Sequence, residues 1–374
     1  MSVPVVLVAG LHGPARAAVA AALLRGRPGA LAVHHDLTAI GGGEAVRVVR
    51  DAGGVLERTP VRLAHGCVTC TVREDLLPWL RDRADGGAPL LVAELWDCVE
   101  PRTVAQALGR AGLRLTAVLT ALDAESTPVD LCRSDRLADL GRAAGAGDGR
   151  RLAEVLAAQI EYATALVVPP SPHCGEDDVA LCAQVLAHLA PLTPLVLPGD
   201  ALPPVTGRAL DVAELDARVE PATARLPGDA RNEAATTVAW LSRRPLHPAR
   251  FFAAMDELAG ASVRSRGRFW LASRPDRMIA WDAVAGVASI ADAGPWLASL
   301  PDAAWDLVPP LRRVAAALDW SAAHGDRIQH LVFTGPDLDG ARVHTLLDAC
   351  LLGPGEDTAD LDDPFTPFLD RETA

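Results

Sequence analysis

The first strand and the turn after it constrain the fold of this chain most strongly. Val3 to Val8 form a continuous apolar run, as in strands that are buried on both faces of a parallel sheet. The run ends in the turn Gly10-Leu11-His12-Gly13-Pro14, and the helix-forming segment 17–24 follows directly. A strand, a glycine turn and a helix in this order are typical of the first unit of a nucleotide-binding α/β fold.

Apolar runs and helical patterns alternate over residues 1–200. Further strands are expected at residues 31–34, 90–94, 116–121, 165–168 and 195–197. Helices are expected at residues 73–84, 102–111, 152–162 and 178–189. This alternation is typical of α/β folds with parallel strands. We therefore predict a doubly wound, mostly parallel sheet for residues 1–200.

A different pattern follows a stretch rich in Pro, Ala and Asp, residues 201–232, which we interpret as a linker. Strands are then expected at residues 236–241, 263–272, 277–282 and 329–334, and helices at residues 247–259 and 340–352. Residues 233–353 are predicted to form a smaller α+β domain. Residues 354–374 are rich in Asp and Glu, and we interpret them as a solvated acidic tail.

All 35 basic residues are arginine, against 48 acidic residues, and the net charge is -13. The absence of lysine excludes lysine Schiff-base chemistry, a lysine general base and the lysine of a phosphate-binding P-loop. The acidic balance opposes sequence-independent binding to nucleic acid or to anionic membranes, although a local arginine patch can still act.

The sequence shows no sign of export or membrane insertion. The apolar run at residues 3–10 is too short to span a bilayer, and no basic residue precedes it. The 7 cysteines, scattered from Cys67 to Cys350, do not form the pattern of a secreted disulfide framework. We therefore expect a cytoplasmic protein with reduced thiols and no membrane partner.

The glycine turn lacks several groups that phosphate chemistry needs. A working P-loop supplies close backbone amides, a lysine for the outer phosphates and a hydroxyl for Mg²⁺. Ala15, Arg16 and Ala17 stand at these positions. Gly10, Gly13 and Arg16 remain as candidate phosphate-binding residues, but Ala17 cannot bind a metal. We predict that Mg²⁺-dependent hydrolysis is lost; the alternative is that the turn only connects strand to helix.

A Cys-x-x-Cys motif follows at Cys67 and Cys70. Two thiolates at this spacing can bind one Zn²⁺, but a tetrahedral structural site needs four ligands. The sequence leaves open which residues complete the set, and the candidates are His65, His34, His35, Glu94 and Cys98. A redox pair and a pair of inert buried thiols are the alternatives.

A third group of candidate residues lies on one predicted strand. Arg264, Arg266, Arg268 and Trp270 share one face, because side chains alternate along a strand. They are spaced about 7 Å apart. Three guanidinium groups and an indole in this arrangement suit phosphates and a stacked base. The alternative is a solvated sheet face with salt bridges to the acidic tail.

Three motifs together resemble a known family. They are Gly66-Cys67-Val68-Thr69-Cys70-Thr71-Val72-Arg73, Gln159-Ile160-Glu161-Tyr162-Ala163 and Arg243-Arg244-Pro245-Leu246-His247-Pro248. With the glycine turn, they resemble the CobW-type GTPases, a family of zinc-linked metallochaperones, and the resemblance covers nearly the whole chain. It implies that the sheet of residues 1–200 is of the P-loop NTPase type, in a GTPase-like domain that is followed by a CobW C-terminal-like domain.

The chain departs from the family at three functional positions. Thr69 replaces the middle thiol of the family's Cys-x-Cys-Cys metal motif. The guanine-reading Asn-Lys-x-Asp falls on residues 169–172, Pro-Pro-Ser-Pro, which have no carboxylate. The acidic strand end survives as Glu94, with Asp97 at a position that is glycine in the family. These losses together argue that GTP is not bound in the usual way.

The resemblance implies a function with no catalytic residues. The His-Gly-Cys-Val-x-Cys signature resembles an actinobacterial subgroup that recruits a ribosome hibernation factor to ribosomes when zinc is scarce. We therefore expect a non-enzymatic, zinc-responsive adaptor. Its expected cofactor is Zn²⁺, without GTP and Mg²⁺, and its expected partner is the ribosome or a hibernation factor. Ribosomal RNA would contact the Arg264 strand.

Two alternatives to the adaptor remain open. The first is an active GTPase metallochaperone that delivers Zn²⁺ to a client protein, with Cys67, Cys70 and Glu94 at the metal sites. The second is an accessory protein of a metal-dependent biosynthetic enzyme.

Overall fold

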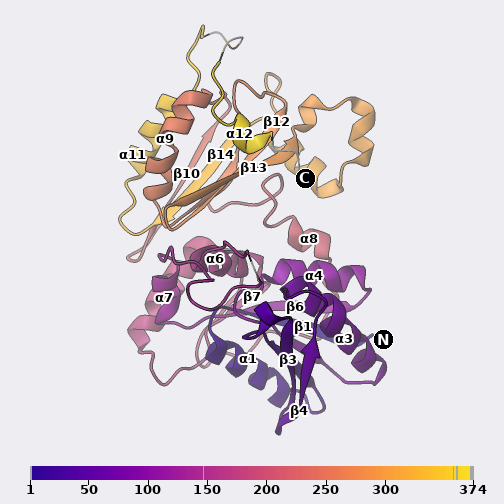
Figure 1. The fold of residues 1–374 in the computed structure, drawn as a ribbon. Coiled ribbons are helices and arrows are strands. Elements are labelled where there is room, and N and C mark those ends of the chain that lie inside the picture. Colours follow the sequence, from indigo (N-terminus) through magenta and orange to yellow (C-terminus); the bar gives the residue numbers. More distant parts are fainter. Residues whose placement is uncertain (1, 146, 357, 359–360, 371–374) are drawn as a thin grey trace. The chain divides into compact units, whose positions relative to one another are not determined.

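The computed structural model describes residues 2–145, 147–356, 358 and 361–370. The chain forms two compact units (Figure 1). The first comprises Met1–Ala183 and Ala190–Asp216, and the second comprises Gln184–Leu189 and Ala217–Ala374. In the described residues, no helix is long and apolar enough to cross a lipid bilayer.

An eight-stranded sheet forms the centre of the first unit, in the order β4-β3-β2-β5-β1-β6-β7-β8. Its strands are β1 (Pro4–Ala9), β2 (Leu31–Asp36), β3 (Glu44–Asp51), β4 (Gly54–Arg62), β5 (Leu91–Glu94), β6 (Arg114–Ala121), β7 (Ala165–Val167) and β8 (Leu195–Val196). All neighbours from β2 to β8 in this order pair in parallel. The predicted α/β class with a mostly parallel sheet is confirmed.

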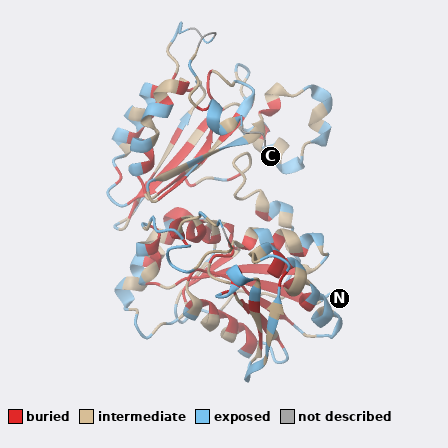
Figure 2. Ribbon diagram, in the orientation of Figure 1, coloured by how far each residue is buried: buried red, intermediate tan, exposed pale blue. Residues whose placement is uncertain are grey.

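Helices cover this sheet (Figure 1). The helices of this unit are α1 (Gly13–Arg25), α2 (Val68–Thr71), α3 (Leu77–Asp85), α4 (Pro101–Arg110), α5 (Ser126–Asp130), α6 (Leu152–Tyr162), α7 (Glu176–Leu189) and α8 (Val212–Asp216), with short turns η1 (Ile40–Gly42) and η2 (Val72–Leu76). The helix α8 packs against α4 rather than on the sheet, and Gln184–Leu189 at the end of α7 belong to the second unit. All six residues of β1 are buried, as its continuous apolar run predicts (Figure 2).

The strands β3 and β4 form a hairpin that the sequence patterns did not predict. The hairpin extends the sheet antiparallel from β2. Most residues of β4 are exposed or half-buried, so it has no apolar run to mark it. The hairpin leads the chain to the Cys-x-x-Cys motif, which begins just after β4.

The second unit contains a six-stranded antiparallel sheet in the order β13-β12-β11-β14-β10-β9. Its strands are β9 (Ala230–Arg231), β10 (Thr236–Ser242), β11 (Arg264–Phe269), β12 (Arg277–Val284), β13 (Val287–Pro295) and β14 (Gln329–Gly335). Its helical segments are α9 (Pro248–Gly260), η3 (Leu297–Ser299), η4 (Asp302–Leu307), α10 (Pro310–Asp319), α11 (Gly340–Cys350) and α12 (Thr366–Leu369). The expected α+β architecture is confirmed.

The stretch predicted as a linker is divided between the units at Asp216. It contains α8, whose Asp216 accepts hydrogen bonds from Tyr162 (2.9 Å) and Gln106 (2.8 Å). Residues 190–216 therefore belong to the first unit, because polar contacts hold them against α4 and α6.

The prediction of a solvated acidic tail at residues 354–374 is wrong for Asp363 and Phe365, which are largely or fully shielded from solvent. Phe365 is fully buried and belongs to the core of the second unit. Asp363 and Asp370 accept charged hydrogen bonds from Arg274, at 2.7 Å and 2.5 Å. Phe365 anchors this segment in the core, and both carboxylates pair with Arg274, although Asp370 also stays exposed to solvent. Residues 357, 359–360 and 371–374 lie outside the described residues.

Candidate functional site

The glycine turn lies between the end of β1 and the start of α1. Gly10 has φ +137°, and a Cβ atom on it would stand 2.1 Å from the carbonyl oxygen of Ala121 on β6. His12 precedes α1, and its Nε2 lies 2.8 Å from Asp130 Oδ2. The first glycine is therefore required by the close approach of two neighbouring strands, with or without a phosphate.

Arg16 turns back into this turn instead of projecting from it. Its Nη1 donates to the Gly10 carbonyl oxygen at 2.5 Å, and its Nη2 donates to Asp97 Oδ1, also at 2.5 Å. The Arg16 side chain is 2% exposed. Burial lowers the pKa of Arg16, and the carboxylate of Asp97 opposes this effect. The side chain at the lysine position thus has its charge neutralised inside the protein.

Glu94 ends β5 as predicted, but it is not free to serve a Mg²⁺ ion. Its side chain is buried and forms an ion pair with Arg50 of β3. Ala17, at the position of the magnesium-binding hydroxyl, has no metal-binding atom. A GTP–Mg²⁺ complex needs an available cation, a hydroxyl and a free carboxylate at these places. The residues present do not fit it.

The segment that would read the guanine base also lacks the required group. Residues 169–172 follow β7 and carry Pro-Pro-Ser-Pro, so no carboxylate stands at the end of this strand. Asp123, after β6, caps the backbone N–H of Ser126 at 2.9 Å. The phosphate, magnesium and base positions thus all lack a needed donor or acceptor.

The two cysteines of the Cys-x-x-Cys motif lie together at the start of α2. Cys67 is the residue before the helix, and its sulfur accepts a hydrogen bond from the Cys70 backbone N–H at 3.4 Å. Hydrogen bonding with the Cys67 thiol raises the pKa of Cys70. Arg73 Nη2 lies 3.8 Å from the Cys70 sulfur. This arrangement suits two ligands to one soft cation, because a helix start brings residues i and i+3 together.

The other zinc-ligand candidates do not complete a ligand set. His34 Nδ1 lies 3.0 Å from the Glu94 carbonyl oxygen, and His35 Nε2 lies 2.7 Å from Asp75. Burial raises the pKa of Cys98 to about 12. Among the described residues, no group of three or more His, Cys, Asp and Glu side chains is placed to hold a metal ion. The structure brings Cys67 and Cys70 together but leaves Glu94 with Arg50.

A cavity of about 400 Å³ lies beside the cysteine motif. Its lining includes Cys67, Cys98 and Thr103. Arg150 also lines it and pairs with Glu100 at 2.5 Å and with Asp148 at 2.9 Å. The cavity lets one side of the motif face open space, which a ligand from another molecule can enter.

His34 supplies a testable pH dependence of stability. Burial first, then the nearby Arg16 and Arg50, lower its pKa from 6.5 to about 4. As the pH falls below 6.5, the unfolded chain takes up a proton that the folded chain does not, so stability falls until the pH reaches about 4. We expect His34→Gln to reduce the loss of unfolding free energy between pH 7 and pH 5 by about 2 kcal/mol. Urea denaturation at both pH values measures it, and equal losses in the two proteins would contradict it.

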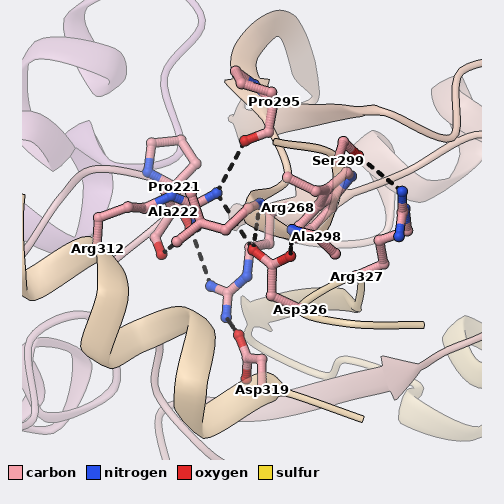
Figure 3. A network of polar contacts seen from close by, with 12 residues as sticks. Pro221, Ala222, Arg268, Pro295, Ala298, Ser299, Arg312, Asp319, Asp326 and Arg327 are labelled. Carbon is pink, nitrogen blue, oxygen red and sulfur yellow. Dashed lines mark hydrogen bonds and ion pairs between the residues drawn. The ribbon is translucent and has the colours of Figure 1, made fainter. Parts of the chain in front are cut away.

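The predicted arginine strand is present as β11, but the face that carries the arginines is not exposed to solvent. Arg264, Arg268 and Trp270 are 5%, 5% and 6% exposed, so the prediction of a solvent-facing platform is wrong for these three. Arg264 Nη1 donates to Asp282 at 2.7 Å. Arg268 Nη2 donates to Asp319 at 2.6 Å, as Figure 3 shows. Arg266 is half-buried, and its Nη2 donates to the Leu189 carbonyl oxygen at 3.4 Å.

The reason is that other segments of the second unit cover this sheet face. Arg268 also donates to the Pro221 carbonyl oxygen at 3.1 Å, and Arg312 donates to the carbonyl oxygens of Ala222 and Pro295 (Figure 3). Trp270 packs with Met278, Trp296 and Ile328. The arginines therefore serve as internal ion-pair partners, and contact with ribosomal RNA stays a prediction without a surface here.

The fold and this site define a class of protein: a P-loop-type α/β domain with a degenerate phosphate turn and a two-thiol motif, joined to an antiparallel α+β domain. Residues 235–351 match the family model described as the cobalamin synthesis protein cobW C-terminal domain.

Sequence relatives identify the family. A Mycobacterium tuberculosis protein named zinc chaperone is 31% identical, over 95% of this chain and 89% of its own length. The zinc-regulated GTPase metalloprotein activator 1 of Dictyostelium discoideum is 23% identical, over 79% of this chain and 66% of its own length. The chain belongs to the CobW-type GTPase family.

A solved structure of a family relative is also similar. The Zn(II)-bound YjiA GTPase from E. coli is 15% identical, with a TM-score of 0.37, over 94% of this chain and 100% of that chain. The family assignment rests on the sequence relatives and not on this similarity.

The sequence patterns did not predict two ion pairs near the glycine turn. The partner of Arg16 is Asp97, and the partner of Glu94 is Arg50. For the first pair a signal was present, since both residues depart from the family motif. The second pair had no signal, because the β3 strand that carries Arg50 was itself not predicted.

Proposed function

We propose that this protein binds Zn²⁺ through the thiolates of Cys67 and Cys70 and carries it to another protein. The observation that carries the proposal is that the Cys67 sulfur accepts a hydrogen bond from the Cys70 backbone N–H at the start of α2, which places the two cysteines side by side. A relative that is similar over nearly the whole chain is named a zinc chaperone, and this supports the proposal.

Two ligands suit a carrier better than a structural site. Zn²⁺ prefers four ligands, and structural sites supply all of them from the protein. Cys67 and Cys70 leave two positions for water or for groups of a receiving protein. The cavity beside Cys67 gives such groups a way to the metal. A receiving protein then adds its ligands before the two thiolates leave, so the ion is never free.

Proton release accompanies this binding. Zn²⁺ binds thiolates, and the raised pKa of Cys70 means that its thiol holds a proton at neutral pH. Zinc has to displace this proton, so the apparent affinity is expected to rise with pH. The nearby Arg73 guanidinium favours the thiolate once it has formed.

The test is zinc binding by the purified, reduced full chain. We expect one Zn²⁺ per chain, and we expect the double variant Cys67→Ser/Cys70→Ser to lose at least about 90% of it, because serine hydroxyls are poor zinc ligands. Equilibrium dialysis followed by metal analysis measures the stoichiometry.

The matched control is Cys132→Ser, at an exposed cysteine outside the motif, which should bind zinc like the parent protein. Thiol titration adds a second measurement: zinc should protect two thiols from a thiol reagent in the parent and none in the double variant. Full zinc stoichiometry in the double variant would overturn the proposal. The finer role of recruiting a hibernation factor to the ribosome stays a prediction.

A further inference from the structure

We infer that Arg16 and Asp97 form an internal lock that closes the former phosphate turn and excludes nucleoside triphosphates from it. The inference concerns anions at the turn and not zinc at the cysteine motif, so it stands or falls separately from the proposed function.

The Arg16 guanidinium occupies the inside of the turn. It bonds to the Gly10 carbonyl oxygen, and its Nη2 is the nearest neighbour, at 3.6 Å, of the place where a Cβ on Gly13 would be. It therefore lies between the two glycines that would wrap a phosphate. Its 2% exposure shows that the protein itself fills this space.

The charged groups around the turn already have partners of opposite charge, so among the described residues no cation there is free for an added anion. Asp97 neutralises Arg16, and its second oxygen lies 3.5 Å from Arg142 Nε. On the other side, Asp130 accepts from His12 of the turn at 2.8 Å. A triphosphate that enters the turn would have to displace the Asp97 carboxylate from Arg16. It would then lie close to the carboxylates of both Asp97 and Asp130. A phosphate-binding turn instead offers an unpaired cation and free backbone amides.

Arg16 and Asp97 both depart from the family motif, and their side chains depend on each other. An ammonium group on lysine is a compact point charge, whereas the planar guanidinium can bond to two acceptors in different directions. Arg16 uses this to hold both the turn, through Gly10, and the segment after β5, through Asp97. Gln159 fixes that segment from another side by donating to the Asp97 carbonyl oxygen at 2.9 Å. Asp97 is therefore the residue that decides whether Arg16 is available to a ligand.

The test compares anion binding by the parent and by Asp97→Asn. Asparagine keeps the shape and one acceptor of the side chain but removes the charge, so Arg16 can pair with an added anion. The probes are inorganic pyrophosphate and GTP, each with and without Mg²⁺, titrated by calorimetry. We expect no saturable binding to the parent at millimolar concentrations, and binding of pyrophosphate to Asp97→Asn at least about tenfold tighter than to the parent.

Three further variants sharpen the test. Arg16→Met/Asp97→Asn should lose the gained binding, because the cation is gone. Arg142→Gln removes only the outer contact of Asp97 and should behave like the parent. Asp97→Gly serves as a second opening variant if Asp97→Asn does not fold. All variants should bind zinc as the parent does.

Two results would overturn the inference. One is saturable binding of GTP to the parent protein, and the other is a folded opening variant that binds pyrophosphate no better than the parent.

Discussion

Replacing Gly10 by alanine is expected to destabilise the first unit by about 3 kcal/mol or more. The new methyl group would stand 2.1 Å from the carbonyl oxygen of Ala121, a backbone atom of the neighbouring strand β6. That atom cannot move without disturbing the β1–β6 pairing at the centre of the sheet. The φ of +137° adds strain for any residue with a Cβ. Urea denaturation measures the loss.

Gly13→Ala is the matched control within the same turn. Its new Cβ would meet only the flexible end of Arg16, at 3.6 Å, which is ordinary van der Waals contact. Gly13 is also the first residue of α1, where alanine is a better helix former than glycine. We therefore expect Gly13→Ala to change the unfolding free energy by less than about 1 kcal/mol. Equal stability of the two variants would contradict the close-approach argument.

This difference bears on function. The presence of Gly10 is explained by the approach of β1 to β6, so it does not indicate that the chain binds a phosphate. The same turn can serve nucleotide binding in one protein and only strand geometry in another. Arg16 and Asp97, rather than the glycines, carry the information about ligands here.

The second large effect is expected for Phe365→Ala, with a loss of about 3–5 kcal/mol from the second unit. Phe365 is fully buried, and its ring lies 6.1 Å from Phe251, 5.3 Å from Phe252 and 6.2 Å from Phe269, measured between centroids. Removing the ring leaves a cavity among aromatic side chains and undocks the segment that Arg274 holds through Asp363. Tryptophan fluorescence during urea denaturation reports on this core through buried Trp281.

Phe368→Ala is the control for this prediction, since that side chain lies on the same segment but is 51% exposed. Its replacement is expected to cost less than about 1 kcal/mol. A loss from Phe365→Ala as small as that of the control would show that the segment is not part of the folded core. The carboxylates of the segment would then be a solvated tail after all.

Much of the first unit follows from local pattern. The buried strands β1, β5 and β6 are largely apolar runs, because a strand buried on both faces needs apolar side chains, and the helices between them have the expected spacing. The half-exposed hairpin β3–β4 was missed, since its residues gain stability from pairing with a neighbour rather than from their own burial.

The arginine strand β11 shows what residue alternation cannot predict, namely which segments cover a strand face. Its alternation placed Arg264, Arg268 and Trp270 on one face, opposite the Phe269 that packs in the main core. Alternation says which residues share a face, but it does not say what covers that face. Residues near Pro221 and Asp319 cover it, and they lie about fifty positions away on either side. On the strand expected to bind RNA, Arg264 and Arg268 are therefore buried and paired with Asp282 and Asp319.

The fold class, the family, the Cys-x-x-Cys motif and the loss of the residue types that read and hold GTP could all be read from the sequence alone. These depend on residue types and on spacings within short segments, which local geometry fixes. Three contacts follow only from the three-dimensional fold: Arg16 pairs with Asp97, Arg50 forms an ion pair with Glu94, and Phe365 anchors the acidic segment. These contacts join residues from distant segments, and the strand order and the packing of the sheet, rather than the local sequence, determine which of them meet.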